Sequence, residues 1–188
     1  MCRECVLFTF QVDFSYKNVT ILGCRDLQGI IKKENAMVYT DLTRKAMLIA
    51  YKAHAGDLDH SGVPYILHPV HLAEQMTTED TCVVALLHDV MEDTFVTEET
   101  LRKAGFTEPQ LTALKLMTHR DGVPYMEYVE ALKDDPIART VKLADLDHNM
   151  DRTRLTEFSE KDEQRYQKYR QAKALLLAAE AEDKRDQE

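Results

Sequence analysis

Four ionisable side chains of this sequence fall on one face of a predicted helix. At 100° per residue they share an arc of about 140°, and they are His88, Asp89, Glu92 and Asp93. Imidazole and carboxylate groups serve as metal ligands and as general acids and bases, so the arc is a candidate for chemistry. An amphipathic helix with a solvated acidic face has the same pattern, and this stretch alone does not distinguish the two.

A second stretch, nearer the C-terminus, gathers an acid, an amide and two cations on one predicted helix face. Its members are Asp145, Asn149, Lys142 and Arg152. Separately, His68 directly precedes Pro69 at the entrance to another predicted helix. A single histidine there is more often a capping or surface residue. The weight of His68 therefore comes from its combination with the other two stretches.

Three segments resemble, in this order, the successive motifs of the HD-domain phosphohydrolases. They are Gly62–Pro69 (GVPYILHP), Leu86–Thr94 (LLHDVMEDT) and Val141–Met150 (VKLADLDHNM). They are most similar to the alarmone hydrolase branch, which comprises the hydrolase domain of the RelA/SpoT proteins and the small stand-alone alarmone hydrolases. A lone His-Asp pair is a weak signal, whereas three motifs in the expected order are a specific one.

The resemblance implies a role for each matching residue. The implied metal ligands are His68, His88, Asp89 and Asp145. Glu92 and Asp93 match the acidic pair beside the attacking water, and Asn149 matches a residue lining the nucleotide pocket. The family implies Mn²⁺, and two imidazoles with two carboxylates are also compatible with Fe²⁺ or Zn²⁺. Lys142 and Arg152 are further candidates for substrate contacts, since cationic groups suit phosphate oxygens.

The implied reaction is metal-dependent hydrolysis of guanosine 3′,5′-bis(diphosphate) or the pentaphosphate at the 3′-diphosphate, with release of pyrophosphate. One departure from the family pattern keeps an alternative open. Before the first motif the family usually has adjacent basic residues, whereas this chain has Asp59 and His60. An HD phosphohydrolase acting on another nucleotide or phosphoester is therefore the second hypothesis. A non-catalytic nucleotide-binding module is the third, and the complete set of implied ligands disfavours it.

The composition limits the class of partner. A net charge of −9, from 24 basic and 33 acidic residues, argues against DNA or RNA. A small nucleotide held through a cation is compatible with that charge. Hydropathy predicts no membrane-spanning segment, and no signal peptide is evident, which favours a cytoplasmic location. The cysteines are expected to be reduced. A homo-oligomer is compatible with the sequence.

Helix start and stop signals predict a compact all-α HD-domain bundle over residues 37–188. The expected helices are 41–54, one beginning at Pro69, 79–93, 98–104, one from 108, 125–133, 136–152 and 159–180. Residues 1–36 are predicted as a separate N-terminal extension: a strand-like hairpin, a disordered arm, or a stretch absent from the native product, with Met37 as the working start. No nucleotide-synthesising domain is expected after Arg154.

Overall fold

The structure is a computed structural model that describes residues 37–155 and 157–186, so the predicted extension 1–36 lies outside the described residues. Within those two ranges the regular structure is helical, and no strand is formed. The elements are α1 (Asp41–Ala53), α2 (Leu67–Ala73), α3 (Glu79–Leu87), α4 (Val90–Asp93), α5 (Glu98–Lys103), α6 (Glu108–Met117), α7 (Tyr125–Leu132), α8 (Pro136–Asn149), the 3-10 helix η1 (Arg152–Arg154) and α9 (Glu160–Asp186).

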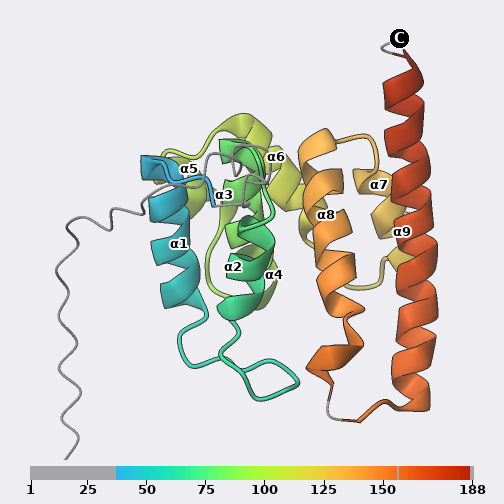
Figure 1. The fold of residues 1–188 in the computed structure, drawn as a ribbon. Coiled ribbons are helices and arrows are strands. Elements are labelled where there is room, and N and C mark those ends of the chain that lie inside the picture. The colour runs from blue at the N-terminus through green and yellow to red at the C-terminus, as the bar shows by residue number, and fades with distance from the viewer. Residues whose placement is uncertain (1–36, 156, 187–188) are drawn as a thin grey trace, which may run out of the picture. The chain divides into compact units, whose positions relative to one another are not determined.

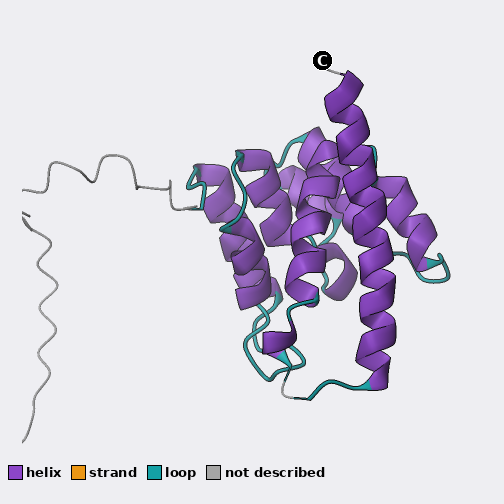
Figure 2. Ribbon diagram, turned by 45° about the vertical axis from the view of Figure 1, so that its right-hand side comes forward, coloured by secondary structure: helices purple, strands orange, loops and turns teal. Residues whose placement is uncertain are grey.

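Helix α3 is the centre of the bundle. All its residues from Thr81 to Leu87 are buried, because α1, α2, α6 and α8 pack around it. Figure 1 shows α1, α3, α8 and α9 side by side in that order, and Figure 2 shows the long α9 on the outside of the body. The predicted all-α bundle is confirmed. None of the described helices is both long and apolar enough to cross a membrane.

Threonine side chains begin four of the helices. Thr40, Thr78, Thr97 and Thr107 each accept a hydrogen bond from the backbone amide three residues later. Such a bond satisfies one of the amides that the first helical turn leaves unpaired. The glycine after α5, Gly105, has a φ of +93°, which a residue with a Cβ rarely adopts and which ends the helix. These predicted helix starts are therefore confirmed.

The predicted single helix over 79–93 is wrong, because the structure divides it at the His-Asp pair. Helix α3 ends at Leu87 and α4 begins at Val90. His88 Nδ1 lies 2.9 Å from the carbonyl oxygen of Ala85, which is the acceptor that the Asp89 amide would use in a continuous helix. The side chain thus replaces the backbone donor, and the two chemically interesting residues lie at a break.

Three other predicted boundaries also differ. Helix α2 begins at Leu67, two residues before Pro69. Helix α8 ends at Asn149 rather than at Arg152, because the Asp151 side chain accepts from the Thr153 amide and starts η1. Helix α9, capped at Ser159 as predicted, extends past residue 180.

Helix α9 offers a matched pair of substitutions for testing how it is held. Leu176 is fully buried against the bundle, whereas its neighbour Leu177 is 44% exposed. We expect Leu176→Ala to lower the free energy of unfolding by about 2–5 kcal/mol, because it leaves a cavity. Leu177→Ala serves as the control, and urea denaturation measures both. Equal losses in the two variants would mean that α9 does not dock through this face.

Candidate metal centre

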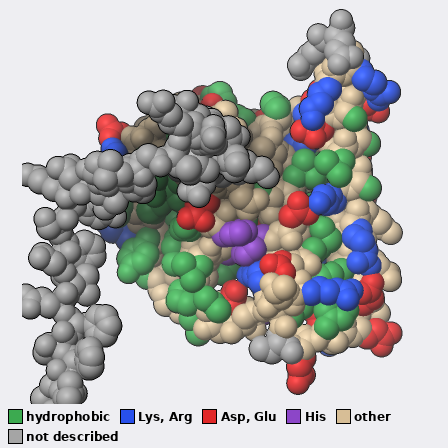
Figure 3. Space-filling view, in the orientation of Figure 1, with side chains coloured by type: hydrophobic (Ala, Val, Ile, Leu, Met, Phe, Trp, Pro, Cys, Tyr) green, Lys and Arg blue, Asp and Glu red, His purple; other side chains and the backbone are tan. Residues whose placement is uncertain are grey.

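Three helical segments bring imidazole and carboxylate groups together in the interior. His68 comes from α2, His88 follows α3, and Asp145 comes from α8. All three are buried, and each offers a donor atom within 4.8 Å of the other two. On one face of the molecule, histidine side chains lie near the middle with acidic side chains close by (Figure 3). The packing of α2 and α8 on α3 therefore creates a cluster that can hold a divalent cation.

The distances between donor atoms fit one shared cation. His68 Nε2 lies 3.2 Å from His88 Nε2 and 3.2 Å from Asp145 Oδ1, and His88 Nε2 lies 2.8 Å from Asp89 Oδ2. Two further pairs, His68 with Asp89 and His88 with Asp145, are 4.0 Å apart. Ligands about 2.1 Å from an octahedral ion lie about 3.0 Å apart when adjacent and about 4.2 Å apart when opposite. Asp89 is not among the three residues whose donor atoms all lie within 4.8 Å of one another, so it stands at the edge of this cluster, beside His88.

The charges of the cluster stabilise one another. Burial disfavours the charged imidazolium of His88, but the carboxylates of Asp89 and Asp145 outweigh it and raise the His88 pKa to about 9. Burial likewise opposes ionisation of Asp145, but the Lys142 ammonium and the imidazoles hold the pKa of Asp145 far below its usual range. Without a metal, a proton on His88 thus supplies positive charge that a cation would supply.

Neighbouring side chains fix the orientation of the carboxylates. Lys142 Nζ donates to Asp145 Oδ2 at 2.9 Å, and Asn149 Nδ2 donates to Asp145 Oδ1 at 2.5 Å. The hydroxyl of Tyr65, from the loop before α2, donates to Asp89 Oδ2. Partners of this kind orient the groups that contact a metal and tune their basicity.

The two acids of α4 lie one turn beyond Asp89. The Glu92 Oε2 atom accepts a hydrogen bond of 2.7 Å from the backbone amide of His119, which leaves its other oxygen available. Partial burial, together with the charge of Asp89, raises the pKa of both Glu92 and Asp93. A carboxylate with a raised pKa is better suited to accept a proton near neutral pH.

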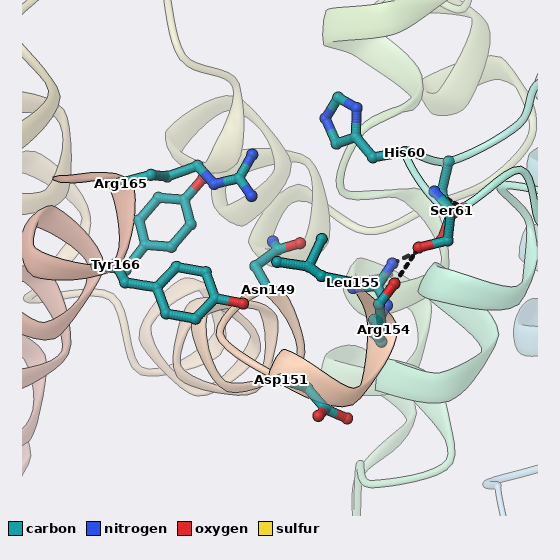
Figure 4. Close-up of a pocket in the computed structure, with 10 residues that line it drawn as sticks. His60, Ser61, Asn149, Asp151, Arg154, Leu155, Arg165 and Tyr166 are labelled. Carbon is teal, nitrogen blue, oxygen red and sulfur yellow. Dashed lines mark hydrogen bonds and ion pairs between the residues drawn. The ribbon is translucent and has the colours of Figure 1, made fainter. Parts of the chain in front are cut away.

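A pocket opens beside Asn149. It is lined by Asp59, His60, Ser61, Asn149, Asp151, Arg154, Leu155, Arg165, Tyr166 and Tyr169. Figure 4 shows Arg165 and Tyr166, from α9, on one side of Asn149 and the residues of the 60–61 loop on the other. The Nε of Arg165 and the hydroxyl of Tyr166 are buried without a hydrogen-bond partner among the described residues. Such groups are donors that a bound polar ligand can satisfy.

The three predicted substrate-contact residues lie in different environments in the structure. Asn149 lines the pocket. Lys142 is buried, with its ammonium on Asp145 and 5.2 Å from the centre of the Tyr128 ring. Arg152 is exposed, pairs with Glu163 at 3.1 Å and does not line the pocket.

Sequence reasoning missed Arg154, Arg165 and His148. Arg165 and Arg154 line the pocket beside Asn149, and His148 contacts His68. The available signal for Arg165 was its place beside Tyr166 and Tyr169 on the docking face of α9.

A scan against protein-family models finds no match. Among curated proteins, the chain is 36% identical over 121 residues to the bifunctional (p)ppGpp synthase/hydrolase SpoT of Escherichia coli. It is 32% identical over 127 residues to a GTP pyrophosphokinase of Myxococcus xanthus. The chain resembles the RelA/SpoT proteins. These two matches cover 57% and 58% of this chain but only 17% of each relative.

A shorter match of higher identity involves a protein named for the hydrolase reaction. The chain is 47% identical over 62 residues to the guanosine-3′,5′-bis(diphosphate) 3′-pyrophosphohydrolase of Vibrio cholerae. This match covers 31% of this chain and 9% of that relative. Among solved structures, a metazoan ortholog of SpoT that hydrolyses ppGpp has the same fold. Its TM-score is 0.59 at 22% identity, over 75% of this chain and 88% of the other. The resemblance stated from the motifs is confirmed.

The cluster predicts that each chain binds one divalent metal ion and that this binding requires His88. We expect His88→Ala to lose that ion, because the imidazole lies between two other donor atoms. His60→Ala is the control, since His60 is an exposed histidine in the 59–63 loop. Elemental analysis after dialysis against Mn²⁺ measures both, with circular dichroism to check folding. Equal metal in the two variants would exclude this ligand set.

Metal binding should also depend on pH in a defined direction. With a pKa of about 9, His88 is protonated at neutral pH in the metal-free protein, and a metal requires the neutral imidazole. The Mn²⁺ affinity should therefore rise with pH below 9, by about tenfold per unit for one released proton. Calorimetric titration at pH 6.5 and 7.5, in two buffers of different ionisation enthalpy, measures the affinity and the proton release. An affinity independent of pH would contradict the assignment of His88.

Proposed function

We propose that the chain hydrolyses guanosine 3′,5′-bis(diphosphate), or the corresponding pentaphosphate, at the 3′-diphosphate with a bound divalent cation. The observation that carries the proposal is the buried cluster of His68, His88 and Asp145, whose ligand Asp145 bonds to the pocket residue Asn149. The relatives named for this reaction support it.

The metal ligands in this proposal are His68, His88, Asp89 and Asp145. Mn²⁺ is the proposed ion, and Fe²⁺ or Zn²⁺ also suit two imidazoles with two carboxylates. A divalent ion supplies two things to phosphoester hydrolysis: a lower pKa for water and screening of charge on the phosphoryl oxygens. The chain itself contributes the fixed positions of these four side chains. Lys142 and Asn149 orient Asp145, and Tyr65 orients Asp89.

In the proposed reaction a water oxygen attacks the phosphorus attached to the 3′-oxygen. The new P–O bond forms as the bond to the 3′-oxygen breaks, so the products are pyrophosphate and GDP or GTP. Glu92 or Asp93 orients the water and accepts its proton, and the departing 3′-oxygen takes up a proton. The amide of His119 holds Glu92 in place for this role. No covalent intermediate is needed.

Substrate contacts in the proposal come from Asn149 and from cations around its pocket. Arg165 adds to the pocket wall a buried Nε–H that has no hydrogen-bond partner in the described part of the chain. Lys142 and Arg152 stay predicted contacts, with their charges already paired to Asp145 and Glu163. We propose a small nucleotide as the partner, without DNA or RNA, and a cytoplasmic location. A homo-oligomer is compatible with the fold.

The role of Glu92 can be separated from general effects of charge. Glu92→Gln removes the proton acceptor, and we expect kcat to fall by about 10²–10⁴-fold, the usual contribution of a general base. The control is Glu99→Gln on α5, since Glu99 is exposed and pairs with Lys103 at 2.8 Å. Release of pyrophosphate from guanosine tetraphosphate in the presence of Mn²⁺ measures both variants.

A panel of nucleotides, run with and without Mn²⁺, tests the substrate itself. Turnover of guanosine tetraphosphate to GDP and pyrophosphate is the expected result. Turnover of another nucleotide or phosphoester, with none of the tetraphosphate, would replace the substrate assignment but keep the metal centre.

A further inference from the structure

We propose that Asp59, Arg154 and His148 form a hydrogen-bonded relay that turns the Nε2 atom of His68 toward the metal site. The inference rests on the proposed metal centre and assigns three positioning residues to it. The relay joins the loop of Asp59 and the 3-10 helix η1 to α8, and it ends on a buried histidine of α2.

The first link fixes Arg154. Arg154 Nη2 donates to Asp59 Oδ2 at 2.9 Å, and both side chains are mostly shielded from solvent. The other oxygen of Asp59 accepts from the amides of Ser61 and Val63 at 2.8 and 3.0 Å. The Ser61 hydroxyl donates to the carbonyl of Arg154 (Figure 4). Asp59 is therefore held by its own loop and in turn holds the guanidinium.

The second link defines the hydrogen-bonding state of His148. Arg154 Nη1 donates to the His148 carbonyl at 3.1 Å and lies 3.2 Å from His148 Nδ1. A guanidinium can only donate, so His148 Nδ1 must act as an acceptor and carry no hydrogen. His71 stacks on the His148 ring, with 4.3 Å between ring centres.

The third link determines which nitrogen of His68 carries a hydrogen. The two Nδ1 atoms of His148 and His68 are 2.6 Å apart, the ring centres are 4.9 Å apart, and the planes differ by 9°. These values place the two nitrogens almost on the line between the ring centres, so the rings are coplanar and joined edge to edge. Since His148 accepts, His68 Nδ1 must donate. A neutral imidazole then presents a lone pair at Nε2, and this atom lies 3.2 Å from Asp145 Oδ1.

The Asp59–Arg154 pair lies where it can affect the proposed site as well as stabilise its own loop. Together with Ser61, the pair lines both the pocket beside Asn149 and a second pocket that contains His68, His71 and His148. The pair thus stands between the proposed substrate pocket and the outer side of the proposed metal ligand.

Metal affinity is the first readout. We expect Arg154→Leu and Asp59→Asn each to weaken Mn²⁺ binding by about 10–100-fold, the usual cost of losing a partner of a metal ligand. Arg154→Lys, a milder change, should fall between wild type and Arg154→Leu, because an ammonium lacks the fork that reaches Asp59 and His148 together. Controls are Arg170→Leu and Asp147→Asn, from the exposed pairs Arg170–Glu163 and Lys173–Asp147. Isothermal titration with Mn²⁺ measures all variants, with circular dichroism to confirm folding.

The tautomer of His68 is the second readout, and a merely structural role would not change it. In the Zn²⁺-loaded protein, ¹⁵N-resolved imidazole spectra should show a hydrogen on His68 Nδ1, and Arg154→Leu should weaken or lose that signal. The double variant D59N/R154L should bind Mn²⁺ no more weakly than Arg154→Leu alone, because both act through one chain of bonds. Unchanged Mn²⁺ affinity and an unchanged tautomer in folded Arg154→Leu would overturn the relay while the metal centre stands. A wild-type protein that binds no Mn²⁺ would instead overturn the proposed function, and the relay with it.

Discussion

The buried pair of Lys142 and Asp145 is the interaction on which the centre of the bundle depends. Asp145 is 5% exposed and faces two imidazoles in the contact between α2, α3 and α8. An ionised carboxylate in such a place costs several kcal/mol unless it is paired and hydrogen-bonded. The ammonium of Lys142 and the amide of Asn149, one turn to either side along α8, meet both requirements. Helix α8 can therefore pack on the apolar α3 while it presents an acid to the interior.

The pair of Lys142 and Asp145 also bears on how a chain with a negative net charge can bind a phosphate-bearing substrate. The net charge of −9 argues against extended nucleic acid as a partner. Four of the acids nevertheless belong to the proposed site or its rim, and the positive charge of a cation bound among them would offset much of the negative field that a phosphate substrate meets. Lys142 supplies part of that positive charge permanently, since its pKa stays well above the usual value despite burial. On the side of Asn149 the pocket is lined by Arg154 and Arg165, which are paired with Asp59 and Asp162.

Local signals in the sequence predicted the helices, and long-range contacts decided the details of the site. Threonine caps and Gly105 act within a few residues, so the starts of four helices and the end of α5 could be predicted directly. The break at His88 could not, because an angular projection assumes an unbroken helix and does not include a side chain that bonds to the Ala85 carbonyl. Arg152 and Arg154 differ by two residues and look alike in sequence. Their contacts distinguish them, because Arg154 bonds to Asp59, 95 positions away, whereas Arg152 pairs with Glu163.

Asp59 shows how a departure from a family pattern can mislead when it is judged by charge alone. In the sequence it stands as a surplus acid against a phosphate substrate. In the structure, burial opposes its ionisation, but hydrogen bonds from Val63, Arg154 and Ser61 outweigh burial and lower its pKa, so it is ionised and fully engaged. The carboxylate and the Arg154 guanidinium cancel each other locally, so the pocket does not gain a free negative charge at this point. Discrimination between phosphate-bearing substrates must then come from the positions of Asn149 and of the Arg165 Nε, which has no hydrogen-bond partner among the described residues, and from how firmly the Asp59–Arg154 pair fixes the pocket wall.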